Sequence, residues 1–330
     1  MKNAIVFLPR YSSYGASSRY RSYAIKNAFY PREKIAPFFS YSRFKNLLYP
    51  VYFLRRVFVL IFYRESVFYV EGDFFPYLPI NFLLPRRYIL DYDDAVWYSE
   101  KVPFQFIHVK YSALISKAEH IVVGSHYLQR FICEHFNGYD SRIFWIPTTF
   151  SKDKFIPKSS FGKDKILCGW IGSPSTSPFI DKVLTIIQNE RLDVKVLLVG
   201  YQGSFANASF VDCLEWSEDN ELLFLEKVDI GLSPLLPGEF AMGKCGFKVV
   251  QYFSMGLPVI ADDYPPNAQF CIEGHNGILC RSNQDWVDAL KNLNDLNLFR
   301  IGRMNRMSFD SICLEEQQNT YEKILGRCVE

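Results

Sequence analysis

The sequence predicts two α/β domains, each built around a parallel sheet that is covered by helices. A length of 330 residues suits two domains of ordinary size better than one. Short apolar strands alternate with helical segments in both halves, the order that produces parallel sheets. Between the halves, residues 151–165 are rich in Pro, Ser, Lys and Asp, which predicts a linker. We therefore expect one domain over 1–150 and another from 166 onward, with a cleft between them.

The first half opens with an apolar strand and then alternates. Strand Ala4–Leu8 is followed by a polar turn over Ser12–Ser18 and by a helix that runs toward Phe29. The other elements predicted for this half are strands over Ser66–Val70, Tyr88–Leu90, His120–Val123 and Phe144–Ile146, and a helix over 103–118, with Ser125 capping the next helix.

The second half repeats this order. The predicted strands cover Ile166–Ile171, Lys195–Val199, Phe210–Leu214, Ile230–Leu232 and Pro258–Ala261, with helices between them and a helical tail from Gln284. Ligands in such sheets bind beyond the carboxyl ends of the strands, often at helix N-termini. The loops that follow strands are therefore the places to look for chemistry.

The charges are unevenly distributed along the chain. A net charge of +2 gives no argument for a nucleic-acid partner, and we expect none. Residues 1–110, however, hold 16 Lys and Arg against 8 Asp and Glu, whereas the rest of the chain is acidic. A basic first half predicts a partner that is anionic, either phospholipid headgroups or a phosphate-bearing acceptor.

The cysteines and the N-terminus both point to the cytoplasm. Eight cysteines show no CxxC pair and no metal-ligand spacing with histidine, so free thiols in a reducing compartment are expected. The apolar stretch Ala4–Leu8 is too short for a signal peptide, and no run approaches the roughly 20 apolar residues of a membrane span.

Residues 43–64 mix aromatic and aliphatic side chains with five basic residues. Such a segment is typical of a helix that lies in a membrane interface, with Arg55, Arg56 and Arg64 for anionic headgroups. Pro50 marks its start or a kink. A helix that packs on the core explains the same composition, so both interpretations stay open.

The segment over 234–263 carries the clearest binding pattern. A helix over Gly243–Phe253 places Lys244, Lys248 and Gln251 on one stripe, opposite an apolar stripe. Two lysines near a helix N-terminus favour a diphosphate, because the helix dipole and the free N–H groups already attract an anion. An ordinary surface helix with solvated lysines is the alternative.

Three loops after strands add candidate residues. The small-residue turn with Gly172, Ser173 and Thr176 allows backbone N–H groups to approach a phosphate, or is simply a turn. The loop with Gly15 and Arg19 opens the first helix, where a basic residue is unfavourable for the dipole and suggests an anionic partner.

The acidic loop contains Asp93 and Asp94, which follow the strand Tyr88–Leu90 in the stretch DYDDAVW. Either carboxylate can orient an acceptor hydroxyl or accept its proton. The alternative is that they cap the next helix through an Asx turn.

The run Gly256-Leu257-Pro258-Val259-Ile260-Ala261 and the residues before it resemble the donor-binding region of the group 1 (family 4) glycosyltransferases. The two glutamates of that family's motif fall on Gly243 and Gln251, and the version here, with Gln251-Tyr252, resembles a subgroup from bacterial lipopolysaccharide and capsule loci. The turn around Gly172, the Asp93–Asp94 stretch and Trp216 also resemble family segments. The resemblance covers most of the chain.

This resemblance implies a GT-B fold, in which two Rossmann-like domains face each other across a cleft and residues 301–330 pack back on the first domain. It implies an acceptor domain over 1–150 and a donor domain over 166–300. The expected activity is transfer of a hexosyl group from a nucleotide-diphosphate sugar to a lipid-linked surface glycan, at the cytoplasmic face of the inner membrane. Retention of configuration and independence of metal and other cofactors are also implied.

The residue roles follow from the same resemblance. Lys244 and Lys248, with the amides of the Gly172–Thr176 turn, would neutralise the leaving diphosphate. Trp216 would border the base, Gln251 and Tyr252 would contact the donor, and Gly15, Arg19, Asp93 and Asp94 would serve the acceptor side. Loss of both glutamates keeps two rival functions open, a non-catalytic scaffold of a membrane glycan-assembly complex and a nucleotide-sugar epimerase.

Overall fold

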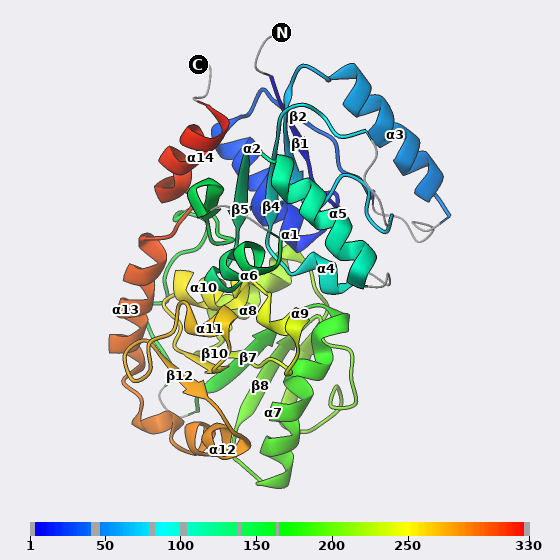
Figure 1. Ribbon diagram of the computed structural model, residues 1–330. Helices are drawn as coiled ribbons and strands as arrows, with labels where there is room; N and C mark the ends of the chain where they lie inside the picture. The colour runs from blue at the N-terminus through cyan, green and yellow to red at the C-terminus, as the bar shows by residue number, and fades with distance from the viewer. Residues whose placement is uncertain are drawn as a thin grey trace. The chain divides into compact units, whose positions relative to one another are not determined.

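The computed structural model describes residues 4–40, 47–78, 83–99, 104–136, 140–162 and 165–326. The chain forms two compact units. The first unit comprises Met1–Phe150, Gly243–Cys245 and Leu314–Glu330, and the second comprises Ser151–Met242 and Gly246–Cys313. Over the described residues, each unit holds one six-stranded parallel sheet. Figure 1 shows the strands with helices around them. The predicted α/β fold of two Rossmann-like domains is confirmed.

The first sheet has the strand order β2-β1-β3-β4-β5-β6. Its strands are β1 (Ile5–Leu8), β2 (Lys34–Ile35), β3 (Val67–Glu71), β4 (Tyr88–Tyr92), β5 (His120–Val123) and β6 (Ile143–Trp145). Side chains alternate between the two faces, so that Ile5 and Phe7 enter one core cluster while Val6 and Leu8 enter the other. Both faces are therefore apolar, as in a sheet with helices on either side.

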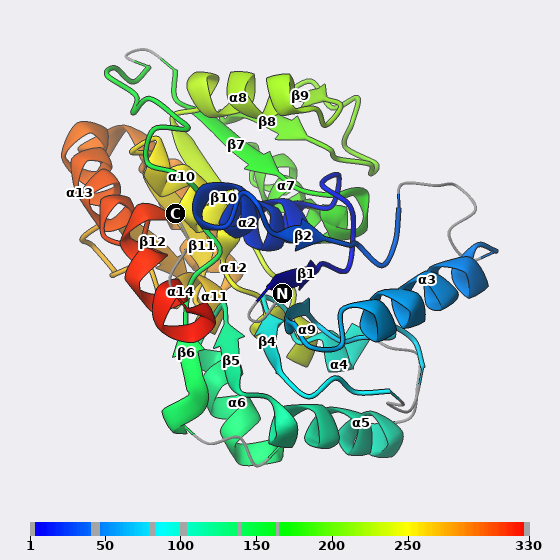
Figure 2. The ribbon, with the colours of Figure 1, turned by 90° about the horizontal axis from the view of Figure 1, so that it is seen from above.

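Helices cover both faces of this sheet (Figure 2). The face of Ile5 and Phe7 packs against α2 (Ala24–Phe29) and α14 (Gln318–Leu325), whereas the other face packs against α3, α5 and α6. The remaining helices of the unit are α1 (Ala16–Ser18), α3 (Tyr49–Phe62), α4 (Val96–Ser99), α5 (Phe104–Lys117) and α6 (His126–Phe136). A π-helical turn over Arg19–Tyr23 joins α1 to α2, so the predicted first helix is one continuous helical run.

The second sheet has the order β12-β11-β10-β7-β8-β9, which counted from β7 is the 3-2-1-4-5-6 order of dinucleotide-binding folds. Its strands are β7 (Leu167–Ile171), β8 (Lys195–Val199), β9 (Val211–Leu214), β10 (Ile230–Ser233), β11 (Val259–Asp262) and β12 (Gly277–Cys280). All five strands that the sequence predicts here are present, and β12 was not predicted.

The helices of the second unit are α7 (Ser177–Asn189), α8 (Glu218–Lys227), α9 (Glu239–Met242), α10 (Phe247–Ser254), α11 (Pro265–Ala268), α12 (Asn283–Lys291) and α13 (Leu298–Asp310). One face of the sheet packs on α7 and α12. On the other face, α8 and α10 approach closely, since a Cβ at Gly169 would collide with Phe224 and one at Gly231 with Tyr252.

The boundaries of the units differ from the predicted ones. Residues 151–165 belong to the second unit, where Phe155 is buried and Lys158 Nζ pairs with Asp229 at 2.8 Å. The tail predicted over 301–330 is divided: α13 lies in the second unit, and Leu314–Glu330 in the first. None of the helices in the described ranges combines the length and apolar content needed to cross a membrane.

Candidate functional site

The second sheet reverses its strand order between β7 and β10. Ligands of such sheets bind beyond the carboxyl ends of the strands at this reversal, because the loops there diverge to opposite faces. The turn Gly172–Thr176 follows β7 directly, and the chain leaving β10 leads through α9 to α10. Candidate phosphate-binding residues are predicted from the sequence in these same two segments.

The ring of Trp170 lies beneath the turn after β7. A Cβ at Gly172 would collide with the Trp170 ring, so glycine lets the turn pass directly over it. Lys248 Nζ lies 5.5 Å from the centroid of the same ring, a cation–π contact. Trp170 is fully buried, and its Nε1 has no hydrogen-bond partner among the described residues. The turn and the lysine thus meet at one aromatic ring.

The backbone amides of the turn are engaged within the protein. Gly172 N–H donates to Val199 O at 3.0 Å, Ser173 N–H to Thr176 Oγ1 at 3.2 Å, and Thr176 N–H to Ser173 O at 2.9 Å. The predicted role of these three amides toward a phosphate is therefore corrected. The exposed hydroxyls of Ser173 and Ser175, 2.9 Å apart, are the polar groups that the turn presents.

The predicted helix over 243–253 is wrong at its start. Gly246 caps α10 with φ +73°, a left-handed conformation that interrupts the helix between Met242 and Phe247. Lys244 therefore does not share a helical stripe with Lys248. It belongs to the first unit, where its Nζ lies 3.9 Å from Asp94.

Gln251 does not lie on an exposed stripe either. Its side chain is buried, with 4% of the residue exposed, and Nε2 donates to Glu221 Oε1 at 3.0 Å. The other oxygen of Glu221 accepts from Trp216 Nε1 at 3.3 Å. Because Trp216 remains 38% exposed, this buried carboxylate links an accessible indole ring to α10. The sequence reasoning gave no role to Glu221, and its place in the first turn of a Ser-capped helix was the available signal.

Tyr252 is a core residue, which corrects its predicted donor contact. It is fully buried against Gly231, and its hydroxyl donates to Leu232 O at 3.1 Å. The hydroxyl is thereby satisfied inside the unit.

In the first unit, Asp91 anchors the acidic stretch. Asp91 is fully buried and ion-paired with Arg21, whose Nε donates to Oδ2 at 2.8 Å. Tyr69 also donates to Asp91, at 2.8 Å. The Asp91 carboxylate is therefore structural. Asp93, which is mostly buried, and Asp94, which is more exposed, are the candidates for acceptor chemistry.

Glu71 is a further buried acid that the sequence reasoning missed. It ends β3, and both of its oxygens accept hydroxyl hydrogen bonds, from Ser18 at 2.7 Å and Ser22 at 3.0 Å. Burial, with the nearby Asp93 carboxylate, raises the pKa of Glu71 to about 8. The only signal in the sequence was an acidic residue at the end of an apolar strand.

Gly15 and Arg19 lie at the start of the first helical run. A Cβ at Gly15 would come within 2.7 Å of Tyr11 Cβ, so the turn requires glycine. Arg19 donates to Ser13 O at 3.3 Å and stacks on the Tyr20 ring at 4.9 Å. Its guanidinium therefore holds the turn as well as carrying charge. Independence of metal stays a prediction.

Part of the chain is similar to a known protein family. Residues 174–295 match the family model described as glycosyl transferases group 1. Apart from Gly243–Cys245, that segment lies in the second unit, and it contains Lys248, Gln251 and Trp216. No curated protein matches the chain by sequence.

Solved structures share the fold at low identity. HepE from Anabaena, in complex with UDP and glucose, is 14% identical with a TM-score of 0.75 over 98% of this chain and 99% of that one. Sucrose-phosphate synthase from Thermosynechococcus elongatus is 11% identical, with a TM-score of 0.73 over 98% of each chain. A glycosyltransferase from Rickettsia africae is 11% identical, with a TM-score of 0.66 over 98% and 99%. These likenesses show that the fold is GT-B, and the family match covers residues 174–295.

Proposed function

We propose that this protein transfers a hexosyl group from a nucleotide-diphosphate sugar to a lipid-linked acceptor in the synthesis of a bacterial surface polysaccharide such as lipopolysaccharide, O-antigen or capsule. The proposal rests on one observation, that Lys248 and the Gly172 turn both lie against the ring of Trp170. This places a cation at the strand-order reversal of the second sheet, within the segment that matches the glycosyltransferase family.

In this proposal the donor diphosphate lies beside Lys248 and the hydroxyls of Ser173 and Ser175. Lysine binds phosphate as a point charge, and the hydroxyls supply neutral donors. Negative charge develops on the diphosphate as the bond to the sugar breaks, so the Lys248 ammonium stabilises the transition state more than the ground state. Transfer with retained configuration and without metal follows from the family resemblance.

The base and ribose are assigned to the Trp216 side of the unit. The exposed part of the indole offers an aromatic surface, and Glu221 fixes the ring through Nε1 at 3.3 Å. UDP is the nucleotide in the HepE complex. Accordingly, a UDP-sugar is the donor that we propose to test first.

The first unit would bind the acceptor through Asp93 and Asp94. Asp94 accepts a proton or orients a hydroxyl in this scheme, and Lys244 Nζ lies 3.9 Å from its carboxylate. Gly15 and Arg19 supply the neighbouring helix start. We place the protein in the cytoplasm, at the inner face of the membrane that holds a lipid-linked acceptor.

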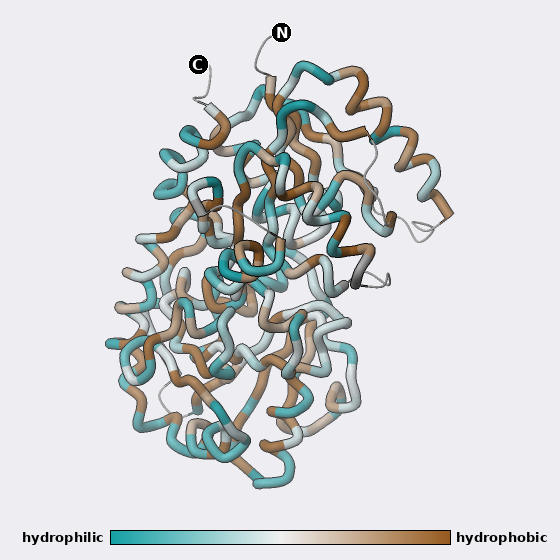
Figure 3. Tube along the Cα trace, in the orientation of Figure 1, coloured by the Kyte–Doolittle hydropathy of each residue, from teal (hydrophilic) through white to brown (hydrophobic). Residues whose placement is uncertain are grey.

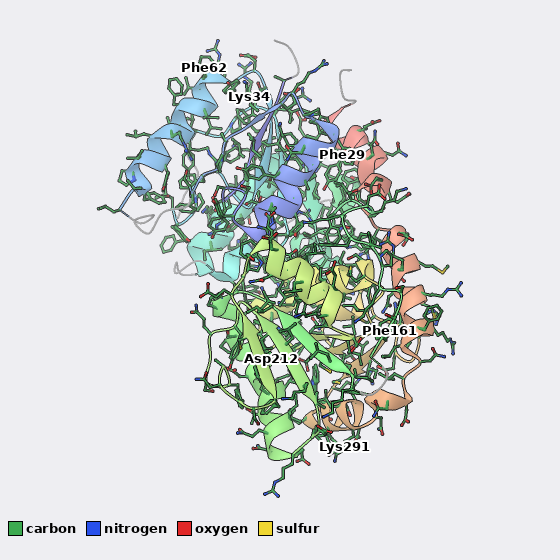
Figure 4. All side chains as sticks on the ribbon, turned by 180° about the vertical axis from the view of Figure 1, so that it is seen from behind. Phe29, Lys34, Phe62, Phe161, Asp212 and Lys291 are labelled. Atoms are coloured by element: carbon green, nitrogen blue, oxygen red, sulfur yellow. The ribbon has the colours of Figure 1, made fainter. Side chains whose placement is uncertain are left out.

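The outer surface of α3 supports contact with an anionic membrane. Its exposed apolar side chains follow a helical spacing, and they are Val51, Leu54, Phe58, Ile61 and Phe62, each between 58% and 66% exposed, with Leu47 at 78% just before the helix. Phe62 projects outward in Figure 4, and Figure 3 shows apolar stretches along α3. Arg55 and Arg64 are exposed beside this stripe, and the sequence from Tyr49 to Arg64 has no acidic residue. Apolar anchors with basic neighbours fit phospholipid headgroups.

Arg56 is not part of that surface, although the sequence suggested it. Its side chain is buried and donates to Pro9 O at 3.4 Å and Ala36 O at 3.3 Å. Burial lowers the pKa of Arg56 to about 9. Residues 43–46 of the predicted segment lie outside the described residues.

Calorimetric titration of the protein with UDP-, GDP- and TDP-sugars tests the donor assignment. We expect UDP binding to weaken by about tenfold or more in Lys248→Met, because one phosphate contact of a charged group is lost. Lys291→Met is the matched control, since Lys291 ends α12 at an exposed position away from the strand-order reversal (Figure 4). Unchanged UDP affinity in Lys248→Met would refute the assignment.

Transfer itself is tested by incubating UDP-sugar carrying a radiolabel with bacterial membranes. Label should enter lipid-extractable material only when the protein is present, and Lys248→Met should abolish the transfer. Conversion of the donor to an epimer in the absence of membranes would instead establish the epimerase. Absence of both reactions, with UDP still bound, would favour the non-catalytic scaffold.

A further inference from the structure

Arg10 is a buried cation that the proposed mechanism does not use. It follows β1, and only 8% of the residue is exposed. Its Nε has no hydrogen-bond partner, and among the described residues no carboxylate lies within 4.0 Å of the guanidinium. A buried charge normally requires a partner, because desolvation costs several kcal/mol. An anion from outside the protein is the partner that this arrangement lacks.

Aromatic rings surround the guanidinium. Its Cζ lies 5.4 Å from the ring centroid of Tyr77 and 5.9 Å from that of Tyr11. Tyr11 in turn stacks on Phe39 at 5.8 Å, and Phe39 lies 5.9 Å from Tyr77. Tyr77 is 43% exposed, so this aromatic group reaches the surface. Aromatic walls around a few fixed polar groups are typical of small-molecule sites.

The nearby acids stabilise the charge of Arg10, but none of those in the described residues forms an ion pair with it. Asp73 is bound by Lys110 Nζ at 2.9 Å and by the Tyr111 hydroxyl at 3.2 Å. Glu71, which has a pKa of about 8 through burial, is largely protonated at neutral pH. Burial lowers the pKa of Arg10, but Tyr11 and Asp73 more than offset this and hold it above its ordinary value. Arg10 therefore keeps its charge.

The position in the sheet also points to a ligand. The first sheet reverses its strand order between β1 and β3, and Arg10 follows the first of these strands while Gly72 follows the second. Gly72 has φ +76°, and a Cβ there would lie 3.9 Å from Arg10 Nη1. A side chain at Gly72 would therefore touch the guanidinium, at the edge where α/β sheets bind ligands.

We propose that Arg10, between Tyr11 and Tyr77, forms a subsite in the first unit that binds an anionic group of the sugar acceptor, a carboxylate or a phosphate. The planar guanidinium matches either group in a two-point hydrogen bond. The tyrosine rings cover the apolar face of the sugar that carries it. The inference rests on the proposed glycosyl transfer and adds the chemical class of the acceptor.

The test measures binding of three probes to the full chain by calorimetry or NMR. The probes are inorganic phosphate, glucuronate and methyl glucoside, which is neutral. We expect one of the two anions to bind at least about tenfold more tightly than methyl glucoside. The anion that binds more tightly identifies the acceptor group as a phosphate or a uronic acid. Arg10→Gln should remove this preference, and Arg10→Lys should keep part of it.

Two variants keep the test decisive. Tyr77→Leu changes a ring that is 43% exposed, so the fold should persist while anion binding weakens severalfold. Arg87→Gln removes an exposed arginine that pairs with Glu119, and should leave anion binding as in the wild type. Equal affinity for the anions and methyl glucoside, or an anion preference that survives in Arg10→Gln after UDP has filled the second unit, would overturn the subsite.

UDP affinity, measured on the same samples, separates the two proposals. The second unit should bind UDP equally well in the wild type and in Arg10→Gln. If UDP binds and the anion preference is absent, the subsite fails and the proposed function stands. If UDP does not bind the wild type, the proposed function fails, whatever the anion result.

Discussion

The amide of Gln251 donates to the carboxylate of Glu221 at 3.0 Å, and both side chains are buried. A glutamate occupies the position of Gln251 in the family motif that the sequence resembles. In this chain that position holds an amide, which serves as the donor to the buried carboxylate of Glu221 on α8.

This pair predicts an unfavourable effect of restoring the motif residue. Gln251→Glu would place two buried carboxylates in contact, which should lower the free energy of unfolding at pH 8 by about 3 kcal/mol. The loss should diminish at pH 5, because one carboxylate then takes up a proton. Denaturant unfolding at both pH values measures this effect. The exchange variant, Glu221→Gln with Gln251→Glu, should recover wild-type stability, and failure to recover would disprove the pairing.

Glu71 should make the stability of the protein fall as pH rises. Its pKa is raised to about 8 in the folded protein, so the folded state holds a proton that the unfolded state has lost between about pH 4.5 and pH 8. Stability contributed by the protonated group is complete at the acidic end of this window and disappears toward pH 8, with a slope of up to about 1.4 kcal/mol per pH unit. Glu71→Gln should flatten this slope and be more stable than the wild type at pH 8. A wild-type profile in this variant would contradict the assignment.

Asp94 is predicted to serve the acceptor and not the donor. Asp94→Asn should lower turnover by roughly tenfold or more, while UDP affinity stays within about twofold of the wild type. Asp212→Asn is the control, because Asp212 is an exposed acid on β9, labelled in Figure 4. Transfer of label to membranes and calorimetry give the two readouts. Wild-type turnover in Asp94→Asn would leave this residue with a structural role.

Tyr252 should affect stability and leave donor binding unchanged. Tyr252→Phe removes one buried hydrogen bond, so a loss of about 1 kcal/mol is expected. Tyr252→Ala opens a cavity against Gly231 and should cost about 3–5 kcal/mol. Thermal unfolding compares the two variants. A large loss of UDP affinity in the well-folded Tyr252→Phe would restore the donor contact that the sequence suggested.

The stripe on α3 predicts binding to anionic vesicles. The wild type should sediment with vesicles of phosphatidylglycerol and phosphatidylcholine, and more weakly with phosphatidylcholine alone, because Arg55 and Arg64 add electrostatic attraction. Phe58→Asp with Phe62→Asp should abolish sedimentation. Phe299→Asp, a change at a phenylalanine of the second unit that is 58% exposed, is the control. A dimer in solution that these α3 changes dissociate would instead show that a second copy covers the stripe.

Much of the architecture could be predicted from short-range patterns. Strands such as Ala4–Leu8 and Lys195–Val199 are apolar runs between polar turns, and such runs bury themselves whatever surrounds them. The order of strands and helices then requires parallel sheets with binding loops at their carboxyl ends. For this reason the turn at Gly172 could be predicted from the sequence, and the role of Lys248 beside it stays a prediction.

The details of the site were decided by tertiary structure. Helical periodicity placed Lys244 on the helix of Lys248, but the helix begins only after Gly246, where the left-handed backbone breaks the repeat. Helical periodicity also predicted that Gln251 lies at the surface. A local pattern does not reveal that Glu221, thirty residues earlier, supplies a partner for a buried amide.

The buried charged residues also separate what the sequence determined from what the tertiary structure decided. Apart from the place of Glu71 at the end of an apolar strand, nothing local distinguishes Glu71 or Arg10 from solvated residues. Their states depend on Ser18, Asp73 and Tyr77, which only the folded sheet brings near. The sequence by itself determined where the chain is apolar, and thereby the fold. The tertiary structure decided which polar groups lose water and which partners they receive, and desolvation depends on those neighbours and not on the residue alone.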